Sequence, residues 1–172
     1  MRMRILIAAT AITIGAVTCA EADMDPVSPR VRSGHPYIRA MIAEAARRSA
    51  TFRRLVSDIE ATDGIVYVEQ GACGHRVHAC LAMAVTPAGD YRILKVLIDA
   101  RQRDWNVMAS IGHELQHALE VLTNTRGTRF EGIFFFYQRE GVTTGDSFET
   151  TAAVRIGTAV ERDVSSFSKR PL

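Results

Sequence analysis

The segment Asn106-Val-Met-Ala-Ser-Ile-Gly-His-Glu-Leu-Gln-His-Ala-Leu-Glu-Val-Leu122 is the most strongly patterned stretch of the chain. Its apolar side chains recur three and four positions apart, which is the spacing of one face of an α-helix. That stripe consists of Met108, Ile111, Leu115, Ala118, Leu119 and Leu122. Asp104 or Asn106 can begin the helix, and Asn124 and Gly127 can end it. We therefore expect one long amphipathic helix with its apolar face against a core.

The residues that precede this helix predict helices followed by strands. Helical spacing begins at Pro36 and starts again after Thr51, which can cap a second helix that ends at Gly64. The expected strands, rich in β-branched and apolar residues, are Ile65–Val68, Val77–Val85 and Tyr91–Ile98. A turn over Thr86–Asp90 and short connections favour an antiparallel meander of three strands.

The residues after the long helix predict one further helix, from Ser147 to Glu161, behind a loop over residues 141–145. Residues 129–140 fit either a strand or a buried helical turn. The chain is therefore expected to form an α+β domain: N-terminal helices, the meander, the long helix and a C-terminal helix. The expected divisions are a signal peptide over 1–20, a flexible lead over 21–34, one domain over 35–163 and a flexible tail over 164–172.

Residues 1–20 have the features of a secretory signal peptide. Met1-Arg-Met-Arg4 is basic, and the residues from there to Val17 carry no charge. This run is too short to span a bilayer as a helix, which takes about 20 residues, and no later segment is long and apolar enough. Small residues around Ala20 suit a signal peptidase, so we expect an exported protein, periplasmic or secreted. The alternative is cleavage before Cys19 and a lipid anchor on that cysteine.

The charge of the chain argues against nucleic acid as a partner. The sequence has 21 Lys and Arg against 19 Asp and Glu, a formal charge of +2. Removal of residues 1–20 also removes Arg2 and Arg4, which leaves 19 charges of each sign. A protein without a basic excess gains little from displacing the counterions of phosphates.

Export decides how Cys73 and Cys80 are interpreted. The short segment between them lies between two expected strands, so in an oxidising compartment the first expectation is a disulfide. The alternative is a metal site formed by Cys73, His75, His78 and Cys80.

The long helix contains the motif His113-Glu-Leu-Gln-His117. Residues four apart lie on one face of a helix, so these two imidazoles can bind one metal ion. Glu114 lies beside such an ion, where a carboxylate can act as general base on a metal-bound water. The face also carries other polar residues, so the alternative interpretation is the solvated side of an amphipathic helix. These residues are Asn106, Gln116, Glu120 and Asn124.

The residues on either side of the motif, Ser110-Ile-Gly112 and Ala118-Leu119, are uncharged. Together with the motif they resemble the active-site helix of the zincin metallopeptidases, as does the order of a sheet, an HExxH helix and a second helix. The resemblance implies a minimal zincin-like fold, a Zn²⁺ cofactor, Glu114 as the catalytic residue and a peptide or protein substrate. Glu120 and Thr123 stand where metzincins have Gly and His, which leaves the gluzincin type. In that type the third ligand is a Glu from a later helix.

Three glutamates compete for the third ligand position. Glu120 shares the face of the two histidines, but three ligands along one straight helix cannot converge on a tetrahedral ion. Glu131 follows the helix and can approach from a loop. Glu149 is expected at the start of the final helix, which supplies the missing direction, so we predict it as the third zinc ligand. An acid there also has a structural explanation, because Asp146-x-x-Glu149 imitates a capping box.

The metal hypothesis predicts peptide hydrolysis. Zinc polarises the scissile carbonyl, and Glu114 passes the proton of the attacking water to the leaving amine. A strand such as Val77–Val85 can hold an extended peptide by edge pairing. Tyr137 or His78 can stabilise the oxyanion, although Tyr137 in an aromatic run is more typical of a core residue. The alternative function is a non-enzymatic exported binding or envelope-structural protein with a structural or vestigial metal site.

Overall fold

The computed structural model describes residues 30–74, 77–124, 137–139, 142–144 and 147–166, and these form a mixed α+β architecture, as the sequence predicts. The helices are α1 (Pro36–Arg48), α2 (Ala50–Glu60), α3 (Asp104–Asn124) and α5 (Thr151–Ser166). The main sheet contains β1 (Val31–Arg32), β2 (Gly64–Gln70), β3 (Ala79–Leu81), β4 (Thr86–Ala88) and β5 (Tyr91–Ile98). A separate hairpin contains β6 (Val142–Thr144) and β7 (Ser147–Glu149).

The main sheet is mixed, and the predicted antiparallel meander is wrong. The strand order is β1-β2-β5-β3, and β4 also pairs with β5. Strands β1, β2 and β5 are parallel, whereas β3 and β4 run antiparallel to β5. Because β5 pairs with β2 in the same direction, the chain between them has to cross over, and parallel strands need a connection of this length. Residues 71–90 make that connection and contribute the outer edge of the sheet.

That outer edge consists of two short strands: β3 lies within the strand predicted over Val77–Val85, and β4 lies within the turn predicted over Thr86–Asp90. Strand β3 pairs with the C-terminal half of β5, and β4 pairs with its N-terminal half. The predicted turn over Thr86–Asp90 is therefore confined to Gly89 and Asp90. Gly89 has a φ of 61°, a left-handed conformation that glycine adopts without a steric penalty.

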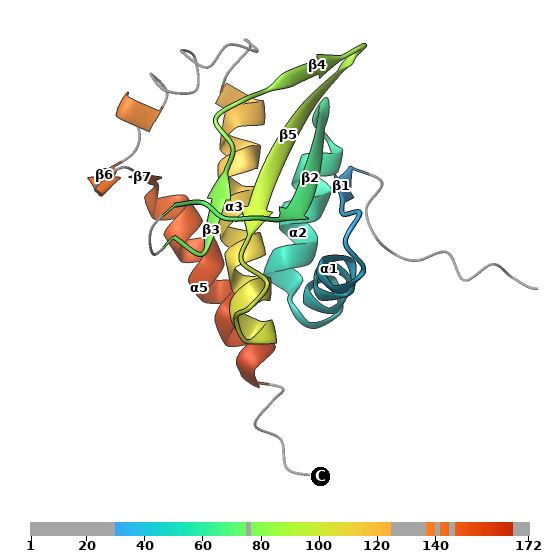
Figure 1. Ribbon diagram of the computed structural model, residues 1–172, viewed down its shortest axis with the longest axis vertical. Coiled ribbons are helices and arrows are strands. Elements are labelled where there is room, and N and C mark those ends of the chain that lie inside the picture. The colour runs from blue at the N-terminus through green and yellow to red at the C-terminus, as the bar shows by residue number, and fades with distance from the viewer. Residues whose placement is uncertain (1–29, 75–76, 125–136, 140–141, 145–146, 167–172) are drawn as a thin grey trace, which may run out of the picture.

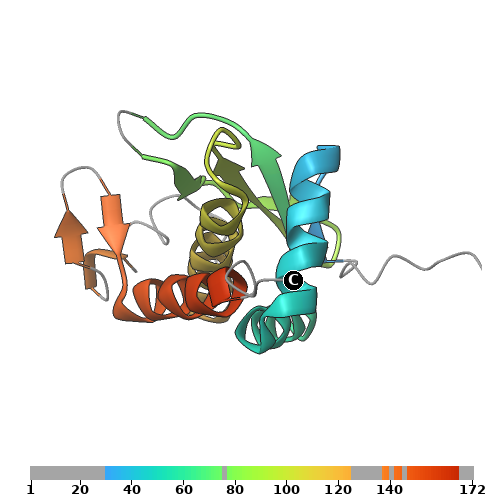
Figure 2. The same cartoon turned by 90° about the horizontal axis from the view of Figure 1, so that it is seen from below.

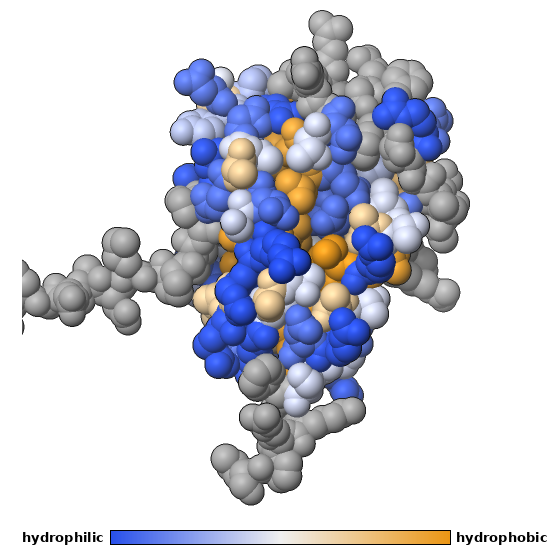
Figure 3. Space-filling view, turned by 180° about the vertical axis from the view of Figure 1, so that it is seen from behind, coloured by the Kyte–Doolittle hydropathy of each residue, from blue (hydrophilic) through white to orange (hydrophobic). Residues whose placement is uncertain are grey.

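The helices pack on one face of the sheet. Helices α1, α2 and α3 contact the strands, and α5 packs on α3. In Figure 1, α3 runs behind the sheet with α5 on one side and α2 on the other, and Figure 2 shows these layers from below. The strand residues fully buried between the layers include Val66, Val68, Leu94, Val96 and Ile98. The side of the molecule away from the sheet carries many hydrophilic residues, with hydrophobic residues visible between them (Figure 3).

Helix α3 lies at the centre of this packing and matches the prediction closely. It begins at Asp104, ends at Asn124 and contacts α1, α2, α5, β2, β3 and β5. Its predicted apolar stripe is buried except for Leu119, which is partly buried. The HExxH residues therefore lie on a helix that is packed against most of the other elements.

Ser49, and not Thr51, separates the first two helices. Its hydroxyl accepts a hydrogen bond from the backbone N–H of Phe52 at 3.1 Å, which caps α2. It also donates to Asp163 Oδ2 on α5 at 2.6 Å, so that this fully buried serine links two helices. Gly64 does not end α2, because α2 stops at Glu60 and Gly64 begins β2.

The C-terminal region also differs from the prediction. The final helix begins at Thr151 instead of Ser147, and residues 142–144 of the expected loop form β6, paired with β7. Helix α5 continues to Ser166, past the expected domain boundary at 163, because Val164 is fully buried in the core. At the other end, β1 pairs with β2 within the expected lead over 21–34.

The expected signal peptide and Cys19 lie outside the described residues. Within the ranges that the structure describes, no helix combines the length and the apolar character needed to cross a membrane.

The Ser49 cap gives a test of the helical packing. Replacement of Ser49 by Ala removes both the α2 cap and the bond to Asp163, and we expect it to lower the free energy of unfolding by about 1–3 kcal/mol. Urea denaturation followed by circular dichroism measures this. The matched control is Ser57→Ala, an exposed serine within α2, which should leave stability unchanged or slightly increased. Equal stability of the two variants would contradict the assigned cap.

Candidate metal centre

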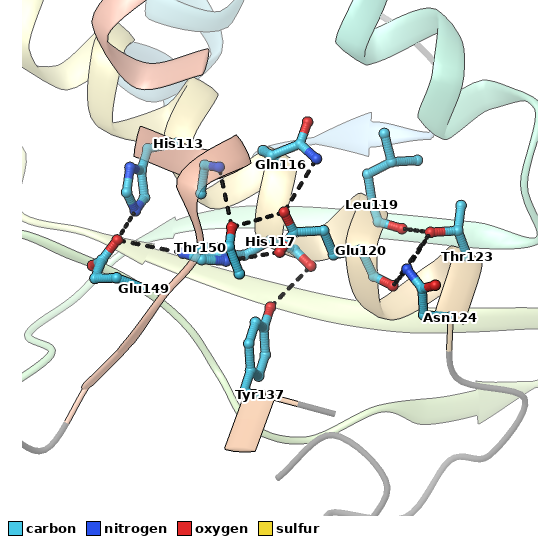
Figure 4. Close-up of polar contacts among 11 residues, drawn as sticks. His113, Gln116, His117, Leu119, Glu120, Thr123, Asn124, Tyr137, Glu149 and Thr150 are labelled. Carbon is cyan, nitrogen blue, oxygen red and sulfur yellow. Dashed lines mark hydrogen bonds and ion pairs between the residues drawn. The ribbon is translucent and has the colours of Figure 1, made fainter. Parts of the chain in front are cut away.

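Helix α3 places the two imidazoles of the motif side by side. The rings of His113 and His117 have centroids 4.9 Å apart and lie nearly perpendicular, at 75°. The Nε2 atom of His113 is 3.1 Å from Glu149 Oε2, and the Nε2 atom of His117 is 3.9 Å from the same oxygen. Both rings therefore direct the same nitrogen toward one carboxylate (Figure 4).

Glu149 reaches the histidines from a different element than predicted. It is the last residue of β7, one position before Thr150, and not part of the first turn of α5. Thr150 caps the helix instead, since its hydroxyl accepts a hydrogen bond from the N–H of Ala153 at 3.1 Å. The capping-box explanation for Glu149 therefore does not hold. The carboxylate still arrives from outside α3, which is the direction that a convergent ligand requires.

The group formed by His113, His117 and Glu149 can hold a metal ion. One donor atom from each of the three residues lies within 4.8 Å of the others. Glu149 Oε2 is buried, and among the described residues it has no hydrogen-bond partner of acceptable geometry. A buried oxygen of this kind costs free energy unless a donor or a cation satisfies it. Two imidazole nitrogens and one carboxylate oxygen are also donors that suit Zn²⁺, so the residues fit the cofactor that the sequence predicts.

The ionisable groups around the three donors favour a single positive charge at this site. Burial lowers the pKa of His113, and the neighbouring His117 lowers it further. Burial also acts to lower the pKa of His117, but hydrogen bonding to Glu120 and contact with Glu149 outweigh it and raise that pKa to about 9. His117 in turn holds the pKa of Glu149 below its ordinary value. A proton on His117 or a bound metal ion can supply the positive charge that these carboxylates favour.

Glu114 is buried between α3 and the outer edge of the sheet. Its residue exposure is only 6%, and burial raises the pKa of its carboxyl group to about 7. The charge on Glu149 raises this pKa further. His117 and a hydrogen bond from the backbone N–H of Leu81 in β3 act to lower it. A carboxyl group with a pKa near neutrality can both accept and release a proton at physiological pH.

The other candidate residues have different places in the structure. Glu120 is not part of the donor group, because its Oε2 lies 3.2 Å from Nδ1 of His117, the ring nitrogen that does not face Glu149. Glu131 lies outside the described residues. His78 is 63% exposed and lies 3.8 Å from Asp99, not in the donor group.

Tyr137 supports His117 instead of offering a free hydroxyl. Its residue exposure is 3%, and its hydroxyl donates to the backbone carbonyl of His117 at 3.1 Å. Its ring packs edge-on against the His117 imidazole at 5.4 Å and stacks on Phe148 at 5.9 Å. Burial raises the pKa of this phenol. These contacts favour the core role over the predicted oxyanion role.

Cys73 and Cys80 form a disulfide with their Cα atoms 5.8 Å apart. The bond uses both sulfur atoms, so it replaces the alternative of a metal site that includes them. Cys80 lies in β3 and directly precedes Leu81, the residue that contacts Glu114, so the disulfide is attached to the strand beside that carboxylate.

Two residues of the site are missed by the sequence patterns, Thr150 and Gly157. Thr150 follows the third donor, and Gly157 lies on α5 where it packs against His113. A Cβ atom at position 157 would lie 3.2 Å from His113 Cβ and 3.3 Å from its Nδ1. A single glycine inside a helical pattern is the signal that indicates such a close approach.

Gly157 gives a test of the packing that supports His113. Ala favours helices by about 1 kcal/mol over Gly, yet we expect Gly157→Ala to lose about 1–2 kcal/mol of stability, because its methyl group overpacks the α3–α5 interface. Chemical denaturation measures the loss. Thr158→Ala, at the exposed neighbouring position, is the control and should be neutral or stabilising. A more stable Gly157→Ala variant would show that the two helices do not approach closely at His113.

No protein-family model matches the sequence, and neither the curated proteins nor the solved structures contain a significant match to it.

Proposed function

We propose that this chain is an exported zinc-dependent hydrolase, and more specifically a metallopeptidase of the zincin type. The observation that carries the proposal is the three-donor group of His113, His117 and Glu149 with the buried Glu114 beside it. Structural zinc sites have four protein ligands, whereas catalytic sites have three and keep one position open. In the part of the chain that the structure describes, no fourth His, Cys, Asp or Glu joins the group, which favours the catalytic kind.

The proposed chemistry assigns a separate role to each side chain. The two imidazoles and the Glu149 carboxylate would hold the zinc ion, which when bound polarises a carbonyl and lowers the pKa of water. Glu114 would accept the proton of the attacking water, because its pKa of about 7 keeps it available as a base near neutral pH. The same carboxyl group would then give that proton to the leaving amine.

The outer edge of the sheet supports a peptide as substrate. Strand β3 is the last strand in the order β1-β2-β5-β3, so its outer side has no strand partner within the described residues. The pairing of Cys80 with Leu97 directs the N–H and C=O groups of Cys80 toward β5, so those of Ala79 and Leu81 point the other way. The N–H of Leu81 is already bonded to Glu114, which leaves the groups of Ala79 and the C=O of Leu81 for a further strand. An extended peptide can pair with such an edge. Because Leu81 also contacts Glu114, a peptide bound there would lie beside the general base.

The disulfide supports the exported location, since disulfides persist in oxidising compartments such as the periplasm or the cell exterior. The signal peptide over 1–20 and the alternative lipid anchor at Cys19 stay predictions.

The decisive variants separate metal binding from catalysis. Glu114→Gln should retain about one zinc ion per chain and lose at least about 100-fold in the rate of peptide hydrolysis, because only the proton acceptor is removed. His113→Ala should lose both the metal and the activity. Elemental analysis and cleavage of a quenched fluorescent peptide library measure the two properties, and Glu161→Gln, an exposed acid on α5, serves as the control.

Other outcomes would sink the proposal. Negligible zinc in both the natural protein and His113→Ala would exclude the metal centre. A protein that binds zinc, cleaves no peptide, and loses stability in Glu149→Gln but not in Glu114→Gln would instead be the non-enzymatic alternative with a structural metal.

Removal of the metal gives an independent test. Dialysis against dipicolinate should abolish hydrolysis and lower the melting temperature, because a ligand that binds only the folded state stabilises it. Added Zn²⁺ should restore both properties, whereas added Mg²⁺ should restore neither, since Mg²⁺ prefers an octahedron of oxygen ligands. Full activity after chelation would contradict a zinc-dependent reaction.

A further inference from the structure

Glu120 contacts three polar side chains beside the donor group, those of Gln116, His117 and Thr150. It lies on α3 one turn after His117, and its side chain is only 11% exposed. Its Oε2 lies 3.2 Å from His117 Nδ1, and its Oε1 accepts hydrogen bonds from Thr150 Oγ1 at 2.8 Å and from Gln116 Nε2 at 3.3 Å. Figure 4 shows the Glu120 carboxylate joined to both the His117 imidazole and the Thr150 hydroxyl. Both oxygens of this largely buried carboxylate are therefore used.

The first of these contacts fixes the orientation of His117. The two nitrogens of an imidazole point in different directions. A carboxylate that accepts a hydrogen bond from Nδ1–H therefore leaves the lone pair of Nε2 available to a metal ion. In this structure Nε2 of His117 faces Glu149 Oε2. Metal-binding histidines commonly give their second N–H to a carboxylate in this way, which sets the tautomer and the ring orientation.

The second contact fixes the element that brings the third donor. Thr150 is the residue after Glu149, and its hydroxyl both accepts from the N–H of Ala153 and donates to Glu120. The cap that begins α5 is thus bonded to a side chain of α3. A shift of this junction would move Glu149 relative to the histidines, because the two residues are adjacent in the chain.

We propose that Glu120 is a positioning residue that aligns the donors of the two elements, since one carboxylate orients His117 and, through Thr150, holds Glu149 against α3. This assignment rests on the proposed metal function but concerns a residue that does not bind the ion. It makes the geometry of the site depend on a bond between α3 and the α5 cap.

The test compares variants that keep or remove the two bonds. Glu120→Ala removes both, and we expect it to weaken zinc binding about 10- to 100-fold, the range found for residues that support metal ligands. Glu120→Gln should recover most of the affinity, because its amide oxygen can accept from Nδ1–H and its amide nitrogen can donate to Thr150. Thr150→Val should resemble Glu120→Ala, and Thr150→Ser, which keeps the hydroxyl, should resemble the natural protein. Competition with a chromophoric chelator measures the affinities.

Two further readouts separate positioning from general stability. The visible spectrum of the Co²⁺-loaded protein reports the coordination geometry and should change in Glu120→Ala and Thr150→Val. It should stay unchanged in Thr123→Ala, a control at an exposed position near the same end of α3. All spectra are recorded well below the melting temperature of each variant.

The metal-free protein supplies a readout that does not depend on the proposed function. With ¹⁵N-labelled histidine, the Nδ1–H proton of His117 should be slowly exchanging in the natural protein and in Glu120→Gln, and should exchange rapidly in Glu120→Ala. Slow exchange together with no zinc binding would overturn the proposed function and with it the positioning role. Zinc binding that is equally tight in Glu120→Ala would overturn the positioning role alone.

Discussion

The packing of α5 on α3 is the contact on which the candidate metal centre depends. The motif on α3 contributes only two donors, and the third belongs to the residue that ends β7 just before α5. The helices meet through small residues: Gly157 lies against His113, and Gly112 lies against Val160. Ser49 adds a link from the start of α2 to Asp163 near the end of α5. The position of Glu149 is thus a product of tertiary packing along the whole of α5.

The sequence predicts helices well and the sheet poorly, for a physical reason. A helix of this kind satisfies its backbone within one segment, so the apolar spacing of residues 106–122 is sufficient to indicate α3. Strand pairing depends on segments far apart in the chain. Residues 65–68 and 91–98 are correctly predicted as strands, but no local pattern indicates that β2 and β5 pair in parallel. The short connections in the sequence favour hairpins. The connection between β2 and β5, which contains the Cys73–Cys80 disulfide, is instead a crossover between parallel strands.

The candidate site likewise contains residues that the sequence predicts and residues that it does not. His113 and His117 follow from their spacing on one helix, and the structure places both rings toward one oxygen. Glu149 is indicated by the need for a ligand from another direction, although the element that carries it ends one residue before the expected helix begins. The bond between Glu120 and Thr150 joins residues 30 positions apart, and no motif of a few residues contains both of them. The position of Glu120 on the face of the two histidines suggests a metal ligand. Its carboxylate instead approaches Nδ1 of His117, the nitrogen that does not face Glu149.

The three donors come from two separate segments of the chain, and this has a consequence for folding. A cation held by α3 and by the residue before α5, as proposed, would act as a cross-link between two segments that are distant in the sequence. By mass action, each tenfold rise of the free ion above its dissociation constant adds about 1.4 kcal/mol to the stability of the native state. The population of folded chains would then follow the supply of metal in the surrounding medium, so that a shortage of the ion would leave the chain open to proteolysis.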